Sequence, residues 1–432
     1  MTMIERSLAP PPDGTESRVG RYRWAICALI FAATVINYID RQMIGVLKPT
    51  LQAEFGWTET TYGDIVFWFQ AAYAIGFVCF GRVVDKLGAR LGYAVAMALW
   101  TLAHIAHGAA RSALTFNIVR FCLGIGESGN FPAGLKAVAE WFPKRERALA
   151  VGIFNAGSNI GAILTPLLVP AITLSMGWPA AFYLTGLLSL AWLPAWWILY
   201  RRPEQHPRVG AAELAHIRSD AEAPSPAIPW RRLLFVRETW AFALGKFLID
   251  PIWWMFLFWL PDFLVRRHGL DLKTFGPPLI VIYLLSDTGS VAGGWLSSTL
   301  MKRGMSVNKA RKFAMLVCAL LVLPIMFAAD IDQLWPAVLI VGLATAAHQG
   351  FSANLYCIPS DVFPGPAVGS VSGIGGAVGA IGGMAMAKYA GWVLDRVGSY
   401  TPIFIVAGCA YLLALLAVHL LTPRLAPAKI TA

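Results

Sequence analysis

The sequence has few charged residues, since only 14% of its 432 residues are Asp, Glu, Lys or Arg and 57% are hydrophobic. Soluble domains carry roughly 25% charged residues. This composition excludes an ordinary soluble protein and predicts a chain that crosses a membrane many times. The net charge of +11 does not indicate a nucleic-acid partner, because the basic residues lie in short segments between apolar runs.

Motifs of catalysis and metal binding are also missing. The six cysteines lie inside apolar segments without a CxxC pair, which excludes a disulfide framework and a cysteine metal site. There is no nucleophile elbow, phosphate-binding loop or His/Cys/Asp metal spacing. We therefore expect no enzymatic activity, no metal and no cofactor. The polar start and the long first apolar run do not fit a cleavable signal peptide.

Apolar segments of about 20 residues are long enough to cross a bilayer, and the chain contains twelve. The sequence therefore predicts an all-α integral membrane protein with twelve transmembrane helices in two six-helix bundles. The predicted spans are residues 23–47, 61–82, 91–109, 113–137, 147–174, 179–200, 237–264, 276–301, 310–329, 334–357, 367–393 and 400–421.

One long polar stretch, between the sixth and seventh spans, divides the chain into two halves. Most Lys and Arg residues outside the spans lie in the tails and in the loops on one side, which predicts that both termini are cytoplasmic. The expected organisation is an N-terminal tail (1–22), an N-terminal bundle (23–200), a linker (201–236), a C-terminal bundle (237–422) and a C-terminal tail (423–432).

An internal repeat supports this architecture. The loop after the second span reads GRVVDKLGAR (81–90), with partial copies GWLSSTLMKRG (294–304) and GWVLDRVG (391–398) after the eighth and eleventh spans. These three spans hold the same place in successive three-helix units. The copies therefore fall where a repeat of three helices puts them.

The residue types of the first loop fit a hinge between helices. Gly81 and Gly88 would allow close helix approach and a tight turn, and Asp85 can meet a helix N-terminus. Lys86 and Arg90 would hold the loop in the cytoplasm. The spacing GxxxDKxGxR resembles the signature of the major facilitator superfamily. The resemblance implies two bundles around a central cavity that opens alternately to each side, with this motif acting in gating.

Charged residues occur at the middle of several spans, where each costs about 2.5–3.5 kcal/mol. Such charges normally face a partner or a water-filled cavity. In NYIDRQ (37–42), Asn37 and Arg41 share a helix face. Asp40 is rotated by about 100° from Arg41 and should face a neighbouring helix or the cavity edge. The complete set is Asp40, Arg41, Arg120, Glu127, Lys246, Asp250 and Asp287.

These charges suggest a coupling mechanism. Arg120 and Glu127 are seven residues apart, so they lie on one helix face. Protonation of two acids would leave a positive cavity whose Arg side chains match a carboxylate. An anion would then bind together with protons, which is the thermodynamic basis of symport. The alternative, that the charges pair off and only join helices, stays open, particularly for Lys246–Asp250 and Asp287.

NYIDRQ, the Arg120–Glu127 pair and residues 139–168 resemble the anion:cation symporter family, which includes bacterial sugar-acid transporters, sialin and vesicular glutamate transporters. The resemblance covers residues 22–422. It implies that protons bind the acids and that the basic residues and tyrosines contact the sugar acid. The matching positions are Asp40 and Glu127 for the protons, and Arg41, Arg120, Tyr38 and Tyr73 for the substrate.

Residues 132–147, KFLIDP (246–251) and 347–363 resemble the hexuronate branch of this family. In that branch a basic residue and an acid match Lys246 and Asp250, and a His-Gln pair matches His348 and Gln349. Galacturonate or glucuronate is therefore the expected substrate, with H⁺ as the coupling ion. The expected setting is the inner membrane of a bacterium, with the chain a monomer in the lipid bilayer. Glycines in 372–383 replace an Asn of galactonate-type relatives, which disfavours an aldonate.

Uncharged polar residues at membrane depth fit the hydroxyls of a sugar acid, because unpaired polar groups in hydrocarbon are costly. The candidates are Asn37, Asn155, Ser158, Asn159, His348 and Gln349. His104 and His107, near the outer end of the third span, are assigned to packing or the interface. Trp253 and Trp254 are assigned to packing rather than to the cavity.

Three other interpretations stay open. The substrate could be another organic anion, such as galactonate, glucarate, tartrate or phthalate. A proton-coupled drug antiporter shares the fold, but it would favour cavity acids and aromatics over paired arginines. A protein that only senses sugar acids would differ from a carrier in producing no flux into proteoliposomes.

Overall fold

The computed structural model describes residues 19–219 and 228–428. The rest of the predicted tails and residues 220–227 of the predicted linker lie outside the described residues. The described parts form helices and no strands. The first half contains α1 (Tyr22–Phe55), α2 (Glu59–His107), α3 (Ala113–Glu127), α4 (Asn130–Trp141), α5 (Lys144–Met176) and α6 (Trp178–Leu199). The linker contains η1 (Pro203–Gln205), α7 (Ala211–Ile217) and α8 (Trp230–Leu233). The second half contains α9 (Arg237–His268), α10 (Gly276–Lys302), α11 (Val307–Val322), η2 (Leu323–Asp330), α12 (Leu334–Val362), α13 (Gly365–Arg396) and α14 (Thr401–Leu421).

The predicted fold, all-α with twelve spans, is confirmed. Within the described residues, ten helical segments are long and apolar enough to cross a membrane. Two further spans complete the twelve. One is the first part of α2, which precedes the non-helical backbone at Gly88. The other is formed by α3 and α4, which follow one another after a break of two residues at 128–129.

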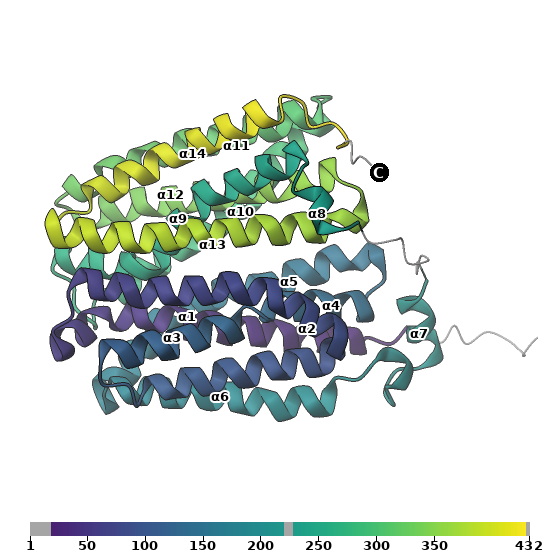
Figure 1. Ribbon diagram of the computed structural model, residues 1–432, viewed down its shortest axis with the longest axis horizontal. Coiled ribbons are helices and arrows are strands. Elements are labelled where there is room, and N and C mark those ends of the chain that lie inside the picture. Colours follow the sequence, from purple (N-terminus) through teal and green to yellow (C-terminus); the bar gives the residue numbers. More distant parts are fainter. Residues whose placement is uncertain (1–18, 220–227, 429–432) are drawn as a thin grey trace, which may run out of the picture.

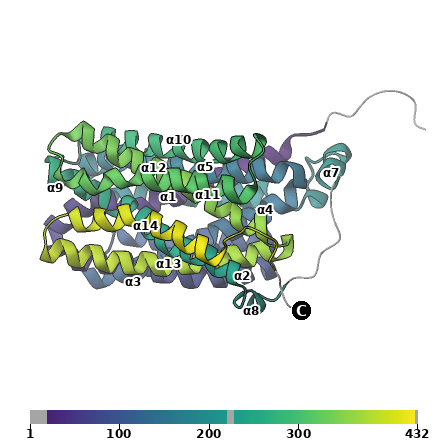
Figure 2. The same cartoon turned by 90° about the horizontal axis from the view of Figure 1, so that it is seen from above.

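The two halves form two layers that run parallel to one another. Figure 1 shows α1–α6 below and α9–α14 above, and Figure 2 shows the same helices from above. The start of α1 contacts α7 through Arg23 and Glu213, and the described chain ends near the same end of the bundle (Figure 1). We call this the terminal end, and we call the other end of the bundle the opposite end.

The two halves repeat the same turns. A left-handed backbone occurs in the first, second and fifth helix-to-helix connections of each half, and each time at glycine. The three matched pairs are Gly56 and Gly269, Gly88 and Gly304, and Gly177 and Gly398. Gly304 and Gly398 end two copies of the sequence repeat and Gly88 lies two residues before the end of the other, so the repeat marks equivalent turns.

Glycines also allow α10 and α12 to pack in close contact. A Cβ atom on Gly293 would lie 2.3 Å from the Cα of Gly350, whereas a Cβ on Gly294 would meet nothing within 4 Å. Gly293→Ala is therefore expected to destabilise the protein by about 1–3 kcal/mol through overpacking. The adjacent Gly294→Ala is the matched control and should be neutral or slightly stabilising. Thermal unfolding of the detergent-purified variants measures both effects, and equal melting temperatures would contradict the close contact.

Candidate functional site

Arg41, in the middle of α1, binds a carboxylate of the protein itself. Its Nε lies 2.8 Å from Oε2 of Glu127, and the two side chains are 3% and 0% exposed. Its Nη2 donates to Oδ1 of Asn37 at 2.9 Å, as the i,i+4 spacing predicts. The structure therefore already has the geometry needed to hold a carboxylate at Arg41.

Four aromatic rings surround the Arg41 guanidinium. Its central carbon lies 4.7 Å from the ring centroid of Tyr38 and 4.9 Å from that of Tyr73. The centroids of Trp254 and Phe69 lie at 5.2 Å and 5.7 Å. Trp254 belongs to α9, so the guanidinium lies where the two halves meet. Trp254 is buried, as its assignment to packing predicts, and its ring packs directly beside Arg41.

Asp40 does not pair with Arg41. Its Oδ2 accepts a hydrogen bond from Ser189 Oγ at 3.3 Å, and its Oδ1 lies 3.2 Å from Nε2 of His104. Ser189 belongs to α6 and His104 to α2, so Asp40 points into the first half. The rotation of about 100° between consecutive helical residues separates the acid from the base. His104, assigned to packing from the sequence, lies beside a predicted protonation site.

Arg120 approaches Arg41 from α3. Two of its guanidinium nitrogens lie 3.5 Å from the backbone carbonyl of Arg41. Its central carbon lies 4.4 Å from the ring centroid of Phe69 and 5.6 Å from that of Phe258. Arg120 and Glu127 are both fully buried, and both reach the same residue of α1 because they share a face of α3.

Glycines bring α3 against α2 around this pair. A Cβ on Gly124 would lie 2.5 Å from the carbonyl oxygen of Phe69, and a Cβ on Gly126 would lie 2.5 Å from the backbone nitrogen of Trp100. The glycines near Glu127 therefore serve the approach of a second helix. Since α3 ends at Glu127, this acid lies at the break within the fourth span.

In the second half, Lys246 and Asp250 form the pair that their i,i+4 spacing predicts, with Nζ 2.7 Å from Oδ2. Lys246 also donates to the hydroxyl of Tyr356, on α12. A Cβ on Gly379 of α13 would lie 2.3 Å from Oδ2 of Asp250. The glycine run at 372–383 therefore lets α13 pack against α9 at this pair.

His348 of α12 is also held by neighbours. Its Nδ1 lies 2.7 Å from the hydroxyl of Tyr411, and its ring stacks on Trp253 with the centroids 5.2 Å apart. His348 is buried, whereas the adjacent Gln349 keeps partial exposure. Of these two candidates, Gln349 is thus the more accessible in this state.

The three polar candidates on α5 differ in exposure. Ser158 is buried, and its hydroxyl donates to the backbone carbonyl of Asn155 at 2.6 Å. Asn155 is exposed and Asn159 is partly exposed. The two amides are therefore accessible, while the serine hydroxyl is used within the helix.

The loop at residues 81–90 forms its predicted turn. Gly88 has φ 78° and ψ 168°, a conformation that only glycine adopts readily. Arg90 donates to the carbonyl of Trp197 at 2.6 Å, and its guanidinium lies 4.6 Å from that ring centroid. Lys86 is exposed. These contacts attach the loop to the end of α6.

Two expectations for this loop are not met in this state. Asp85 contacts no helix N-terminus, because its Oδ1 accepts from Nζ of Lys136 on α4 at 3.2 Å. A Cβ on Gly81 would meet nothing within 4 Å, so no other helix approaches closely there.

The copy of the motif at 391–398 places an acid at a helix N-terminus instead. Oδ1 of Asp395 accepts from the backbone N–H of Glu59 at 2.9 Å, and Oδ2 accepts from that of Thr60 at 2.7 Å. These are unpaired donors of the first turn of α2, where a negative charge is favoured. Asp395 thereby joins the second half to the first at the opposite end.

A buried ion network lies beside this contact. Nζ of Lys48 lies 2.6 Å from Oε2 of Glu59 and 2.8 Å from Oδ2 of Asp262. Nε of Arg266 lies 2.8 Å from the same Asp262 oxygen, and Arg266 also pairs with Glu59. Lys48 is fully buried. The network ties α1 and α2 to α9.

Other polar contacts between the halves lie towards the same end. Gln42 donates to the hydroxyl of Tyr283 at 3.0 Å, and Tyr62 donates to the carbonyl of Phe258 at 2.8 Å. Close packing of Gly63 against Ala387 adds to them. The hydrogen bonds and ion pairs that join α1 and α2 to α9, α10 and α13 in the described part of the chain lie between the level of Gln42 and the opposite end. The structure is therefore closed at the opposite end.

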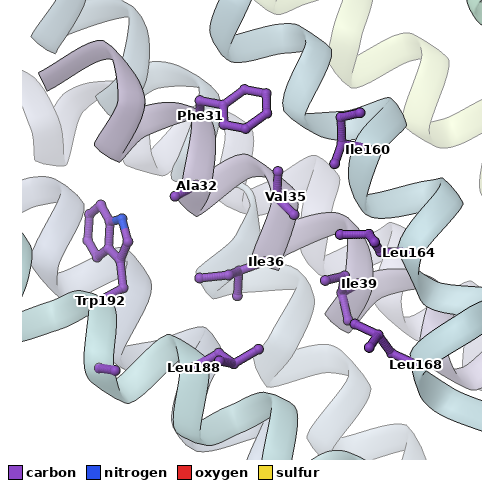
Figure 3. Close-up of a pocket in the computed structure, with 11 residues that line it drawn as sticks. Phe31, Ala32, Val35, Ile36, Ile39, Ile160, Leu164, Leu168, Leu188 and Trp192 are labelled. Atoms are coloured by element: carbon purple, nitrogen blue, oxygen red, sulfur yellow. The ribbon is translucent and has the colours of Figure 1, made fainter. Parts of the chain in front are cut away.

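An apolar groove lies apart from these charges. It has a volume of about 560 Å³ and runs between α1, α5 and α6, with Phe31, Ile36, Leu164 and Trp192 among its lining residues (Figure 3). Its lining contains no charged side chain. It could not compensate the charge of a carboxylate, so it is not the anion site.

Twelve spans in two related halves, with charged groups buried where the halves meet, define a secondary transporter. The chain belongs to the Major Facilitator Superfamily, whose family model matches residues 30–387. Members of this family are transporters, so the expectation that the chain is not an enzyme is confirmed.

Curated relatives agree with the resemblance in the motifs. The chain is 32% identical over 403 residues to the hexuronate transporter of Escherichia coli (strain K12), covering 92% of this chain and 93% of that protein. It is 34% identical over 308 residues to the galacturonate transporter of Dickeya chrysanthemi, covering 70% of this chain and 89% of that protein. The predicted resemblance to hexuronate transporters is confirmed.

Solved structures share the fold at low sequence identity. The D-xylose-proton symporter superposes with a TM-score of 0.73 at 16% identity, covering 92% of this chain and 97% of that chain. A bacterial homologue of the lysosomal transporter Spinster superposes with a TM-score of 0.71, also at 16% identity, covering 95% and 96%.

Proposed function

We propose that this protein is a proton-coupled symporter that takes up a sugar-acid anion, with a hexuronate such as galacturonate or glucuronate as its substrate. The observation that carries the proposal is the Arg41–Glu127 pair, in which a buried guanidinium holds a carboxylate between the two halves. Relatives named as hexuronate and galacturonate transporters support the substrate class.

The pair explains how a proton and an anion would bind together. Glu127 and the substrate carboxylate compete for Arg41. Protonation of Glu127 removes its negative charge, so Arg41 becomes free to bind the substrate. Deprotonation would restore the internal pair and release the anion. Each ligand therefore increases the affinity for the other, which is a positive coupling free energy between two sites.

The ring cluster and the amides fit the rest of a sugar acid. Tyr38 and Tyr73 offer hydroxyls beside Arg41, and Trp254 offers an apolar face to a sugar ring. Asn155 and Gln349 supply further donors and acceptors from α5 and α12. Lys246 stays paired with Asp250 in this state. It would contact the substrate only if the second half rearranged.

Alternating access follows from the closure at the opposite end. If the termini are cytoplasmic, as the distribution of basic residues predicts, the structure is the state closed to the outside. Opening requires the Lys48 network and the Asp395 contact to separate. The binding site at Arg41 would then face the outside.

The test is uptake of radiolabelled galacturonate into proteoliposomes with an imposed inward proton gradient. We expect galacturonate to accumulate and this accumulation to be lost when a protonophore removes the gradient. We also expect glucuronate to compete more strongly than galactonate or phthalate. Gradient-driven uptake of phthalate with no uptake of galacturonate would show that the substrate is an aromatic acid and not a hexuronate. Substrate binding without flux for any of these anions would identify a sensor instead.

A further inference from the structure

The proposed function uses Asp40 as a proton site but leaves its surroundings unexplained. Asp40 is fully buried, and its carboxyl lies between α2 and α6, away from Arg41. His104 on α2 and Thr185 and Ser189 on α6 are also fully or almost fully buried. Four polar side chains therefore meet inside the first half, behind the anion site.

The hydrogen-bond directions fix which His104 nitrogen carries a proton. The hydroxyl of Thr185 donates to the carbonyl of Ala181 at 2.8 Å, so its only hydrogen is used. Nε2 of His104 lies 2.7 Å from the Thr185 oxygen, and that oxygen can act only as the acceptor. His104 therefore carries its proton on Nε2, directed at Thr185, with Asp40 Oδ1 3.2 Å from the same nitrogen.

We propose that His104 is a positioning residue of the proton-coupling site: its Nε2–H is bonded to Thr185 in this state, where Oδ1 of Asp40 has no hydrogen-bond partner among the described residues, and its availability to Asp40 sets the pH at which Asp40 takes up its proton. This inference rests on the proposed function, because it assigns a partner to one of its two proton sites. Asp40 takes its proton from solvent and returns it there, while the Nε2 proton stays on His104. The ring directs this N–H at Thr185 while Asp40 is protonated, and a small rotation of the ring directs it at Asp40 when the carboxyl is ionised.

Other charges face this cluster and act on it too. Glu127 of α3 interacts electrostatically with Asp40, and Arg120 of α3 interacts with both His104 and His107. Helix α6 contributes only neutral groups to the cluster. In the described parts of the chain, His107 has no polar contact with Asp40, since its Nδ1 lies 2.7 Å from the Ala103 carbonyl and its ring stacks on Phe182.

Two replacements should move the pH dependence in opposite directions. His104→Met removes a donor that favours the ionised carboxyl, so the protonated form should persist to higher pH. The midpoint of transport should rise by about one pH unit, the change expected when one neutral donor is lost. Thr185→Val removes the competing acceptor and frees Nε2–H for Asp40, so the midpoint should fall by a similar amount.

The measurement is counterflow of radiolabelled galacturonate by the full-length chain in proteoliposomes, with equal pH on both sides, from pH 5 to pH 9. His107→Met is the matched control and should keep the wild-type midpoint. His104→Gln, which can present a donor at the same place, should restore it at least in part. If His104→Met does not fold, Thr185→Val still gives the direction of the midpoint shift. His104→Gln still tests whether a donor at this place keeps the midpoint near that of the wild type.

The outcomes separate this inference from the function on which it rests. A wild-type counterflow that does not change with pH would contradict the proton coupling itself. Counterflow by the wild type could instead depend on pH while the midpoint of His104→Met stays unshifted, or while the midpoints of His104→Met and Thr185→Val shift in the same direction. Either result would overturn only the role of His104.

Discussion

Glu127→Gln is expected to abolish accumulation of the sugar acid against its gradient while preserving exchange of labelled for unlabelled substrate. The amide keeps the shape of the protonated acid but cannot lose a proton. Arg41 therefore remains available to the substrate carboxylate in every state, and binding no longer depends on a proton at Glu127. Accumulation should fall to the equilibrium level, and exchange should stay within a few-fold of the wild type.

The matched control is Glu140→Gln on α4. Glu140 contacts the hydroxyl of Tyr200 and lies away from Arg41, so gradient-driven accumulation should survive. Proteoliposome uptake under an imposed proton gradient, followed by exchange at zero gradient, measures both activities in each variant. Full accumulation by Glu127→Gln would show that Glu127 takes no part in the coupling. Asp40 would then be the one proton-binding acid of the proposed mechanism.

Spacing within one helix predicts a large part of the site. The i,i+4 rule places Asn37 beside Arg41 and Lys246 beside Asp250, and two helical turns bring Arg120 and Glu127 to one face. These contacts form as expected because a helix fixes them without reference to any other segment. The twelve spans are predictable for a related reason, since length and hydropathy alone decide whether a segment can cross a bilayer.

Contacts between helices are not predictable in this way. Trp254 reaches Arg41 from the other half, and His104 reaches Asp40 from a span more than 60 residues away in the sequence. No local sequence pattern around Trp254 or His104 predicts which residue of another helix it contacts. The same holds for Asp395, whose likeness to Asp85 predicts a helix N-terminus but not that of α2.

Lys48→Met is expected to open the end that is closed in this structure. Lys48 is fully buried and is paired with Glu59 and Asp262. Loss of one partner of a buried ion network typically costs about 3–5 kcal/mol; here Arg266 alone would then face Glu59 and Asp262, so one negative charge would stay buried and uncompensated. Opening separates α2 from α9 and exposes both carboxylates to water, so the cost falls mainly on the closed state. The ratio of open to closed molecules should rise by about 100-fold or more.

Spin labels on the loops at the opposite end measure this change. Ala109 and Lys273 are exposed and lie in different halves. Spin labels on cysteines placed there, in a chain without the six native cysteines, should be farther apart in Lys48→Met than in the wild type.

Lys388→Met is the control at the same interface. Lys388 pairs with Asp64 near the surface, with 49% and 35% of the side chains exposed, and such pairs contribute only about 0–1 kcal/mol. Adding Glu59→Gln to Lys48→Met should restore part of the closed population, since one uncompensated charge is removed. An unchanged distance distribution in Lys48→Met would show that packing of glycines such as Gly63 against Ala387, rather than the ion network, keeps this end closed.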